Sequence, residues 1–266
     1  MKNFLLSKNI RYISLISSLI IVIISFISII FFESKYAIIE VLLIFVTYIV
    51  SLLIADFNFK VKELFNLFII PSLIIFLFFS FIVRYDLLRS SIYLIIFIGL
   101  IYFIFLYASF IHISIINASK FEPVPLARFS YTINYIILTV ISYFSFLYGF
   151  LQNNILLLIL YILIFSIIII SQNLISLEYD PKEIKLYTII GILIFFNLSI
   201  FFVFYPIYTF IAALSLALVM YIYNGILLHN TTNKIPYFNY IEYLIFSIII
   251  VLSLIYIPSW GISGHL

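Results

Sequence analysis

The sequence predicts an all-α fold, a polytopic transmembrane helix bundle of about nine spans, and two observations carry that prediction. The first is composition: of 266 residues, 67% are hydrophobic, 20% are aromatic and 9% are charged, with a mean hydropathy of +1.35. Soluble domains are roughly half apolar and a quarter charged. Because so few charged side chains cannot cover the exterior of a soluble domain, we expect lipid to be the solvent for most of it.

The second observation is the length of the apolar runs. A helix needs about 20 mostly apolar residues to cross a bilayer. Charged residues, prolines and asparagines divide the chain into nine runs of this kind, which we expect to form a single transmembrane domain over residues 1–266. The runs cover residues 12–32, 37–57, 64–83, 91–116, 127–151, 155–177, 186–205, 206–228 and 238–257.

Two of these segments allow an alternative. The basic stretch "MKNFLLSKNIR" resembles the start of a secretory signal, but the apolar run after it is long and lacks the small residues of a cleavage site, so a retained anchor is predicted. Tyr205 and Pro206 join two runs with almost no loop. The combined stretch is too long for one crossing, and proline suits the first turn of a new helix. A count of eight spans would fuse two adjacent helices.

The distribution of Lys and Arg predicts the orientation, because short cytoplasmic loops accumulate these residues. With the N-terminus inside, ten lie in cytoplasmic segments and three outside. The cytoplasmic ones are Lys2, Lys8, Arg11, Lys60, Lys62, Lys120, Arg128, Lys182, Lys185 and Lys234, and the others are Lys35, Arg84 and Arg89. We therefore expect a cell-membrane protein with a cytoplasmic N-terminus and the C-terminus outside. The net charge of +3 is then a topology signal and not a nucleic-acid footprint.

Several kinds of chemistry are not expected. The chain has no cysteine, no loop large enough for a nucleotide-binding domain, no glycine-rich phosphate loop and no metal-ligand spacing of His and Glu. The acidic run "LEYDPKE" holds Glu178, Asp180 and Glu183, but the interpretation we favour is a solvated loop in which Lys182 and Lys185 balance the acids. The sequence predicts no metal, no cofactor and no enzyme activity.

The cytoplasmic stretch "SKFEPVPLARFS", residues 119–130, is unusually rich in charge and proline for this chain. Pro123 and Pro125 push the residues before them out of the helical region and stiffen the segment. We favour a simple connector between the fourth and fifth spans. The alternative is a partner surface formed by Pro123, Pro125 and Arg128.

Intramembrane polar residues are costly in lipid and mark contacts or cavities. On the nine-span map they fall toward the cytoplasmic ends of their helices and form one layer: His112, Asn134, Gln172, Asn173, Glu178, Asn224, His229, Asn239 and Glu242. One hypothesis is a pocket in which Glu242 or Glu178 binds a cation or proton and a histidine modulates it. The interpretation we favour is that these residues reach the headgroups.

Three further features give packing predictions. Asn197 lies near the middle of the seventh span and is expected to face protein, because lipid would leave its amide unpaired. Glu40 and Arg84 lie at a similar depth and could pair. Ala213 and Ala217 form a narrow face, expected at the centre of the bundle or, less favoured, at a homodimer seam.

The C-terminal half contains "VPLARFSYTINYIILTVISYFSFLYG", "SLEYDPKEIKLYTIIG" and "FYPIYTFIAALSLALVMYIYNGIL". This half resembles uncharacterised polytopic integral membrane proteins of small-genome, AT-rich bacteria, through Pro125, Leu126, Arg128, Pro206, Tyr223 and Gly225. Richness in Ile, Phe, Tyr, Asn and Lys agrees with AT-rich codons. The resemblance implies a bacterial membrane protein and brings no activity with it.

Two functions from different classes follow. The preferred one is a non-catalytic scaffold or subunit of an envelope complex, whose partners are the lipid bilayer and other membrane proteins. It explains the sparse intramembrane charge, because nothing hydrophilic needs to cross. The alternative is a small-solute or lipid-handling carrier that uses the cytoplasmic polar layer.

Overall fold

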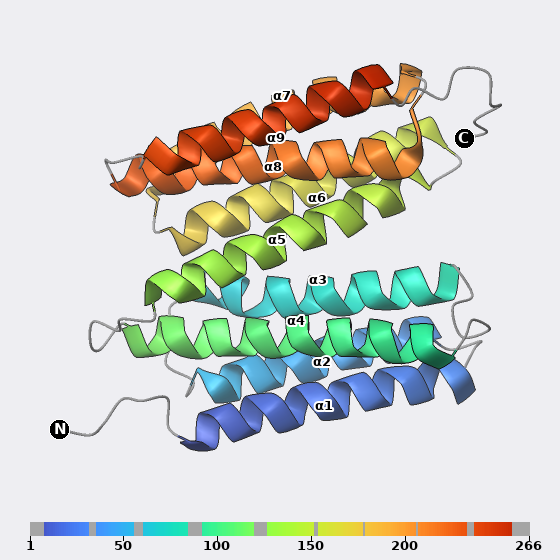
Figure 1. The fold of residues 1–266 in the computed structure, drawn as a ribbon. Coiled ribbons are helices and arrows are strands. Elements are labelled where there is room, and N and C mark those ends of the chain that lie inside the picture. Colours follow the sequence, from blue (N-terminus) through green and yellow to red (C-terminus); the bar gives the residue numbers. More distant parts are fainter. Residues whose placement is uncertain are drawn as a thin grey trace. The chain divides into compact units, whose positions relative to one another are not determined.

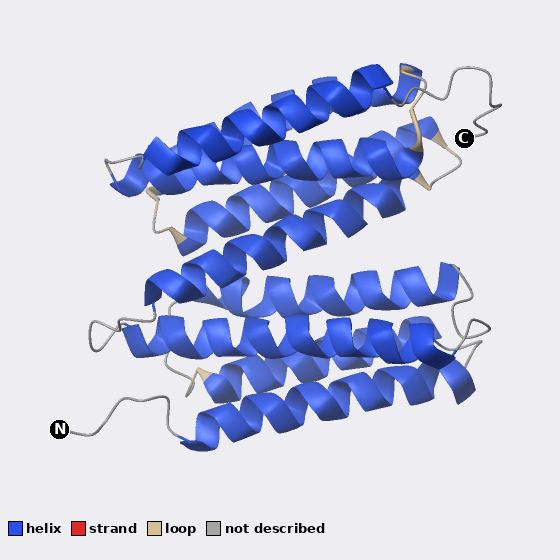
Figure 2. Cartoon of the chain, in the orientation of Figure 1, coloured by secondary structure: helices blue, strands red, loops and turns tan. Residues whose placement is uncertain are grey.

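A computed structural model describes residues 8–31, 36–55, 61–84, 92–119, 127–151, 154–177, 179–205, 207–232 and 237–256, with the backbone alone at several helix ends. Regular structure in these ranges is helical throughout (Figures 1 and 2). The helices are α1 Lys8–Phe31, α2 Tyr36–Ile54, α3 Val61–Arg84, α4 Ile92–Ser119, α5 Ala127–Phe150, α6 Ile155–Ser176, α7 Pro181–Phe204, α8 Thr209–Thr232 and α9 Tyr237–Tyr256. The prediction of an all-α helical bundle is confirmed.

The start of α7 is set by capping residues and lies before the apolar run. The helix α7 begins at Pro181, not at Leu186, because "DPKE" is a helix start. Glu183 accepts a hydrogen bond from the Asp180 backbone N–H at 3.4 Å, and Pro181 occupies the first turn. The start of α6 is fixed similarly by Asn154, whose Oδ1 accepts from the backbone N–H of Leu156 at 2.9 Å.

The contacts group the chain into two compact units, Met1–Ile137 and Leu138–Leu266. In the first unit, α1 packs against α2 and α4, α2 against α3 and α4, and α3 against α4. The buried face of α1 carries small polar residues: Ser14, Ser18, Ser25 and Ser28. Small side chains let helices approach closely in a membrane. On α3, the Phe78 ring stacks on Tyr102 of α4 at 3.8 Å and meets Phe26 of α1 edge-on at 5.3 Å.

The second unit contains α6 to α9 and the C-terminal half of α5. The helix α6 packs along α7, while α8 contacts α6, α7 and α9. The end of α5 joins them through aromatic contacts, Phe146 with Phe195 at 5.7 Å and Phe150 with Phe202 at 6.4 Å. The alanine face of α8 is buried within this unit, so the prediction that it lies inside the bundle is confirmed.

The outward faces of the helices are apolar. Four described helical segments are long and apolar enough to cross a membrane: Ile96–Ile115, Ile155–Ile175, Pro181–Phe204 and Thr209–Leu228. Shorter apolar helical stretches lie in α1, α2, α3, α5 and α9. Together with the composition, these helices indicate an integral membrane protein.

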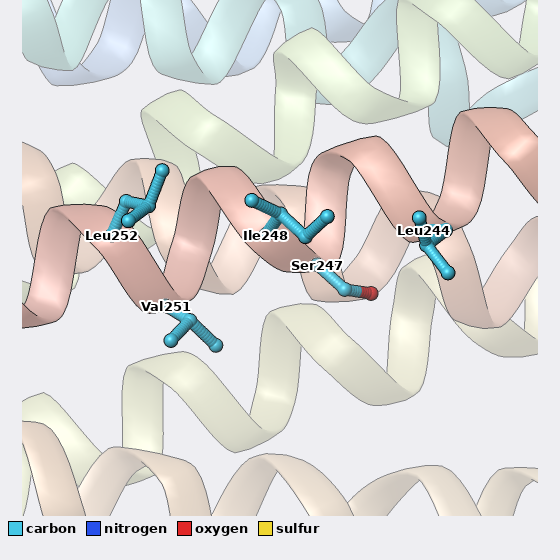
Figure 3. A pocket seen from close by; sticks show the side chains of 5 residues that line it. All are labelled: Leu244, Ser247, Ile248, Val251 and Leu252. Carbon is cyan, nitrogen blue, oxygen red and sulfur yellow. The ribbon is translucent and has the colours of Figure 1, made fainter.

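An open groove of about 370 Å³ follows α9. Figure 3 shows the side chains that line it, all projecting from this one helix: Leu244, Ser247, Ile248, Val251 and Leu252. The Ser247 hydroxyl donates to the Tyr243 carbonyl oxygen of its own helix at 2.8 Å. The groove is therefore an apolar, outward surface of the kind that lipid acyl chains fill.

The helix α7 approaches its neighbours closely at a glycine. A Cβ at Gly191 would collide with Ile170 Cδ1 of α6 and lie 3.2 Å from Tyr223 Cε1 of α8. At Gly149 of α5 the nearest atom, Ile162 Cγ1, is 3.4 Å away, which is an ordinary contact. A Cβ at Gly191 therefore requires neighbouring side chains to shift, whereas a Cβ at Gly149 does not.

We expect Gly191→Ala to lower the thermal unfolding midpoint of the purified protein in mild detergent. The matched variant Gly149→Ala should leave the midpoint unchanged or raise it, because alanine is the better helix former by about 1 kcal/mol. Thermal unfolding of both variants measures the difference. Equal shifts in the two would contradict the packing assigned to Gly191.

Candidate functional site

The polar cluster of the second unit is centred on α8, where three polar residues fall within four positions. Asn224, buried, accepts a hydrogen bond at its Oδ1 from the Asn173 side-chain nitrogen of α6 at 3.1 Å. Asn173 lies in the last turn of α6. Just after this helix, the Tyr179 hydroxyl donates to the Leu227 carbonyl oxygen of α8 at 2.6 Å. Two hydrogen bonds therefore join the end of α6 to α8.

A second face of α8 holds α7. The Tyr223 hydroxyl donates to the Tyr187 carbonyl oxygen at 2.5 Å, next to the close approach at Gly191. The Tyr187 ring meets the Tyr179 ring edge-on at 5.5 Å. Aromatic side chains with one polar end suit this position, because the ring packs while the hydroxyl finds a backbone acceptor.

A third face of α8 holds α9. The Glu242 carboxylate accepts a hydrogen bond from the Tyr221 hydroxyl, and the Tyr221 ring packs edge-on against Tyr243 and Phe246. Glu242 is half-buried. Glu242, which the hypothesis of a cation or proton site named, is thus hydrogen-bonded to a tyrosine of α8.

The predicted polar layer is only partly described. His112 and Asn134 are buried in the unit Met1–Ile137, whereas Asn224 and Glu242 belong to Leu138–Leu266. Asn239 lies in α9, one turn before Glu242, and His229 lies in α8; their side chains fall outside the described residues, as does Glu178. The single layer therefore stays a prediction, while the structure brings Asn224 to Asn173 and Glu242 to Tyr221.

The proposed partner surface cannot be built from the described residues. Pro123 and Pro125 lie outside them, and Arg128 is described by its backbone alone, in the first turn of α5.

The expectation for Asn197 is wrong. Its side chain is exposed, not packed against protein, and its amide nitrogen donates to the Leu193 carbonyl oxygen of its own helix at 2.7 Å. A short amide can reach the carbonyl one turn back, so a local acceptor satisfies one N–H without a neighbouring helix. This bond lowers the free-energy cost of placing the Asn197 amide in lipid, but the second N–H and the amide oxygen still contribute to that cost.

In the first unit, polar groups meet where α1, α2 and α4 come together. The Ser25 and Tyr102 hydroxyls are 3.3 Å apart, and Glu40 of α2 lies within electrostatic range of Tyr102. The predicted partner of Glu40, Arg84, has no described side chain. The contact between the Ser25 and Tyr102 hydroxyls joins α1 to α4, and sequence reasoning missed it.

Three buried polar groups of the second unit take no part in these bonds, and the Ser145 hydroxyl is one of them. The Gln172 amide and the Thr188 hydroxyl make no hydrogen bond in the described part of the chain. Among those same residues, no three of His, Cys, Asp or Glu gather as metal ligands would. The chemistry that the cluster offers is therefore uncharged hydrogen bonding, apart from Glu242.

The chain was also compared with known proteins. No family model, curated protein or solved structure matches it. The resemblance of its C-terminal half to bacterial membrane proteins therefore stays a prediction.

We expect a double-mutant cycle to reveal coupling between Asn173 and Asn224. Each of Asn173→Leu and Asn224→Leu leaves a buried amide without its partner, whereas the double variant removes both amides. Unfolding free energies should therefore be non-additive by about 0.6 kcal/mol, within the range measured for hydrogen bonds between membrane helices.

The matched control cycle pairs Asn173→Leu with Ser199→Ala. Ser199 is buried in α7 but donates to the Phe196 carbonyl oxygen of its own helix at 2.8 Å, so these two changes should be additive. Additivity in both cycles would mean that the bond between the two asparagines contributes nothing.

Proposed function

We propose that the chain is a non-catalytic membrane scaffold or a subunit of an envelope complex in a bacterial cell membrane. The observation that carries this proposal is the exposed asparagine of α7. Asn197 lies within a helix that is apolar enough to span a membrane, on a face that the other helices of the second unit leave open.

An asparagine side chain offers two N–H donors and one acceptor oxygen. The bond to Leu193 uses one donor. The remaining amide capacity is costly against lipid and is satisfied when another membrane helix supplies a polar group, since such residues hydrogen-bond across helices. A partner helix on this face explains the position of Asn197.

The other intramembrane polar groups support a structural role. Asn173 with Asn224, Tyr223 with Tyr187 and Tyr221 with Glu242 each join two helices of the second unit. Side chains used in this way hold a bundle together. The scaffold needs no catalytic group and no cofactor.

For the topology, we propose a cytoplasmic N-terminus and an outside C-terminus, supported by the ten-to-three distribution of Lys and Arg. In this arrangement Pro123, Pro125 and Arg128 face the cytoplasm and remain candidates for a second partner contact.

The carrier alternative rests on a different observation. Gln172 and Thr188 place hydrogen-bonding groups inside the second unit without partners among the described residues, as a solute site would. Under that alternative, Glu242→Gln abolishes transport. Under the scaffold proposal this change leaves function intact, because glutamine still offers an oxygen to Tyr221.

We expect Asn197→Leu to release the chain from its assembly. The purified wild type, at 31.2 kDa, should migrate in mild detergent as part of a larger complex, and the variant should shift toward the monomer. The loss of about 1 kcal/mol of interhelical hydrogen bonding corresponds to a several-fold weaker association. Size-exclusion chromatography with light scattering measures it.

The control is Phe196→Leu, which changes an exposed apolar side chain on the same helix. This variant should keep the wild-type size. A monomeric wild type, or an Asn197→Leu complex of unchanged size and stability, would contradict the proposal.

A further inference from the structure

The exposed face of α7 carries a heptad pattern. In such a pattern two positions of every seven, called a and d, line one side of a helix and face a partner helix. The a positions are Ile190, Asn197 and Phe204, and the d positions are Leu186, Leu193 and Ile200. Ile200 is half-buried and the other five are exposed. We call these six residues the heptad stripe.

The opposite face of α7 packs within its own unit. Its buried residues are Gly191, Phe195, Ser199 and Phe202. They recur every three or four positions on the side of the helix that lies away from the heptad stripe. The helix therefore has one face inside the second unit and a separate face that the other helices of this unit leave open.

The helix α3 has the same stripe in a buried form. Both α3 and α7 contain 24 residues, and when they are aligned without a gap from their first residues they are identical at nine positions. Leu193 and Asn197 then correspond to Leu73 and Leu77 of α3, which are both buried. This pattern of side chains thus packs against protein in α3, and in α7 an amide replaces a leucine where the stripe is open.

The side chains of the stripe favour a pair of parallel helices. Isoleucine at a with leucine at d favours two strands, and a single asparagine at an a position fixes the register and the number of helices. Ile190, Leu193 and Asn197 fit this pattern. Because Asn197 uses one N–H on the Leu193 carbonyl oxygen, one N–H and the amide oxygen are left. Across a two-fold axis, the N–H of one asparagine can donate to the oxygen of the other.

A second copy of the chain supplies the matching helix. Two copies inserted in the same membrane have the same orientation, so their α7 helices are parallel. Among the asparagine and glutamine side chains described within helices, the others are buried: Asn134, Gln172, Asn173 and Asn224. Within the described chain, the exposed amide that can meet Asn197 is therefore Asn197 of another copy.

We propose that α7 forms the interface of a parallel homodimer. Asn197 of one copy hydrogen-bonds Asn197 of the other, and the apolar residues of the heptad stripe pack around this pair. The inference rests on the proposed function, in which another membrane helix covers Asn197, and it identifies that helix as α7 of a second copy.

The test is disulfide cross-linking of the full-length protein in its membrane. The chain has no cysteine, so Leu193→Cys introduces a single thiol at a d position of the stripe. A disulfide requires Cα atoms within about 7 Å of each other. A membrane-permeable oxidant should therefore give a product of twice the 31.2 kDa chain mass. Adding Asn197→Leu should lower the yield about fivefold.

The control is Ile164→Cys in α6, an exposed position at the depth of Asn197. Ile170 of α6 lies against Gly191 of α7, and the two consecutive helices run in opposite directions along each other. Six residues back from Ile170 and six residues on from Gly191 therefore lie at one depth. This variant should give only the background of random collisions.

Equal yields from Leu193→Cys and Ile164→Cys would overturn the homodimer. A Leu193→Cys chain that stays monomeric under oxidation, while Asn197→Leu still reduces the size of the complex in detergent, would overturn it too. That result would leave the proposed function standing with a different partner, whereas an unchanged size in Asn197→Leu contradicts the proposed function itself.

If Leu193→Cys does not accumulate, two differently tagged wild-type copies decide. They should co-purify in mild detergent, and Asn197→Leu in both copies should lower the recovery about fivefold. Failure of the two wild-type copies to co-purify would overturn the homodimer.

Discussion

The structure depends on one constraint: hydrocarbon supplies no hydrogen bonds, so polar groups inside the membrane must find partners within the protein. The chain meets this constraint in two ways. Serines bond to carbonyls of their own helices, as Ser25 does to Ile21 at 2.7 Å and Ser142 to Leu138 at 2.6 Å. Asparagines and tyrosines bond to neighbouring helices. The serine bonds satisfy small polar side chains within one helix, so that helices can approach closely there. The asparagine and tyrosine bonds join neighbouring helices.

The second device is concentrated on α8. Tyr221, Tyr223 and Asn224 occupy three faces of one turn and bond to α9, α7 and α6 respectively. The bond from Tyr223 lies beside Gly191 of α7, where an added Cβ would lie 3.2 Å from Cε1 of the Tyr223 ring. A small number of polar side chains thus fixes the register of four helices whose remaining contacts are apolar and could slide.

Composition and the length of apolar runs were enough to predict the helices, because hydropathy reports directly whether a segment can lie in lipid. Helix ends were harder. Asp180 and Glu183 were interpreted as a solvated loop, although with Pro181 between them they start α7. The same charged residues fit a solvated loop and a helix start, and only the spacing of Asp180 and Glu183 as a capping box distinguishes the helix start.

The site was less predictable. Asn224 and Glu242 were found because polar residues are rare in the spans, but their partners Asn173 and Tyr221 depend on how two helices are aligned. Helices that are apolar on every side give no periodic signal of that alignment. With 22 tyrosines in the chain, no single tyrosine stood out as a partner. Asn197 was assigned to the interior because its reach to the Leu193 carbonyl oxygen was overlooked.

If the polar side chains of the second unit bond helix to helix and hold a packed bundle, no aqueous path is expected along the described part of α8. The chain has no cysteine, so a single one can report on water. Met220→Cys replaces a side chain that is 0% exposed in α8, and Lys182→Cys marks an exposed position. In permeabilised membranes, a water-soluble maleimide should label Lys182→Cys and not Met220→Cys, because a thiol away from water stays protonated and unreactive. Equal labelling of the two positions would contradict the account and indicate a water-filled path through the bundle.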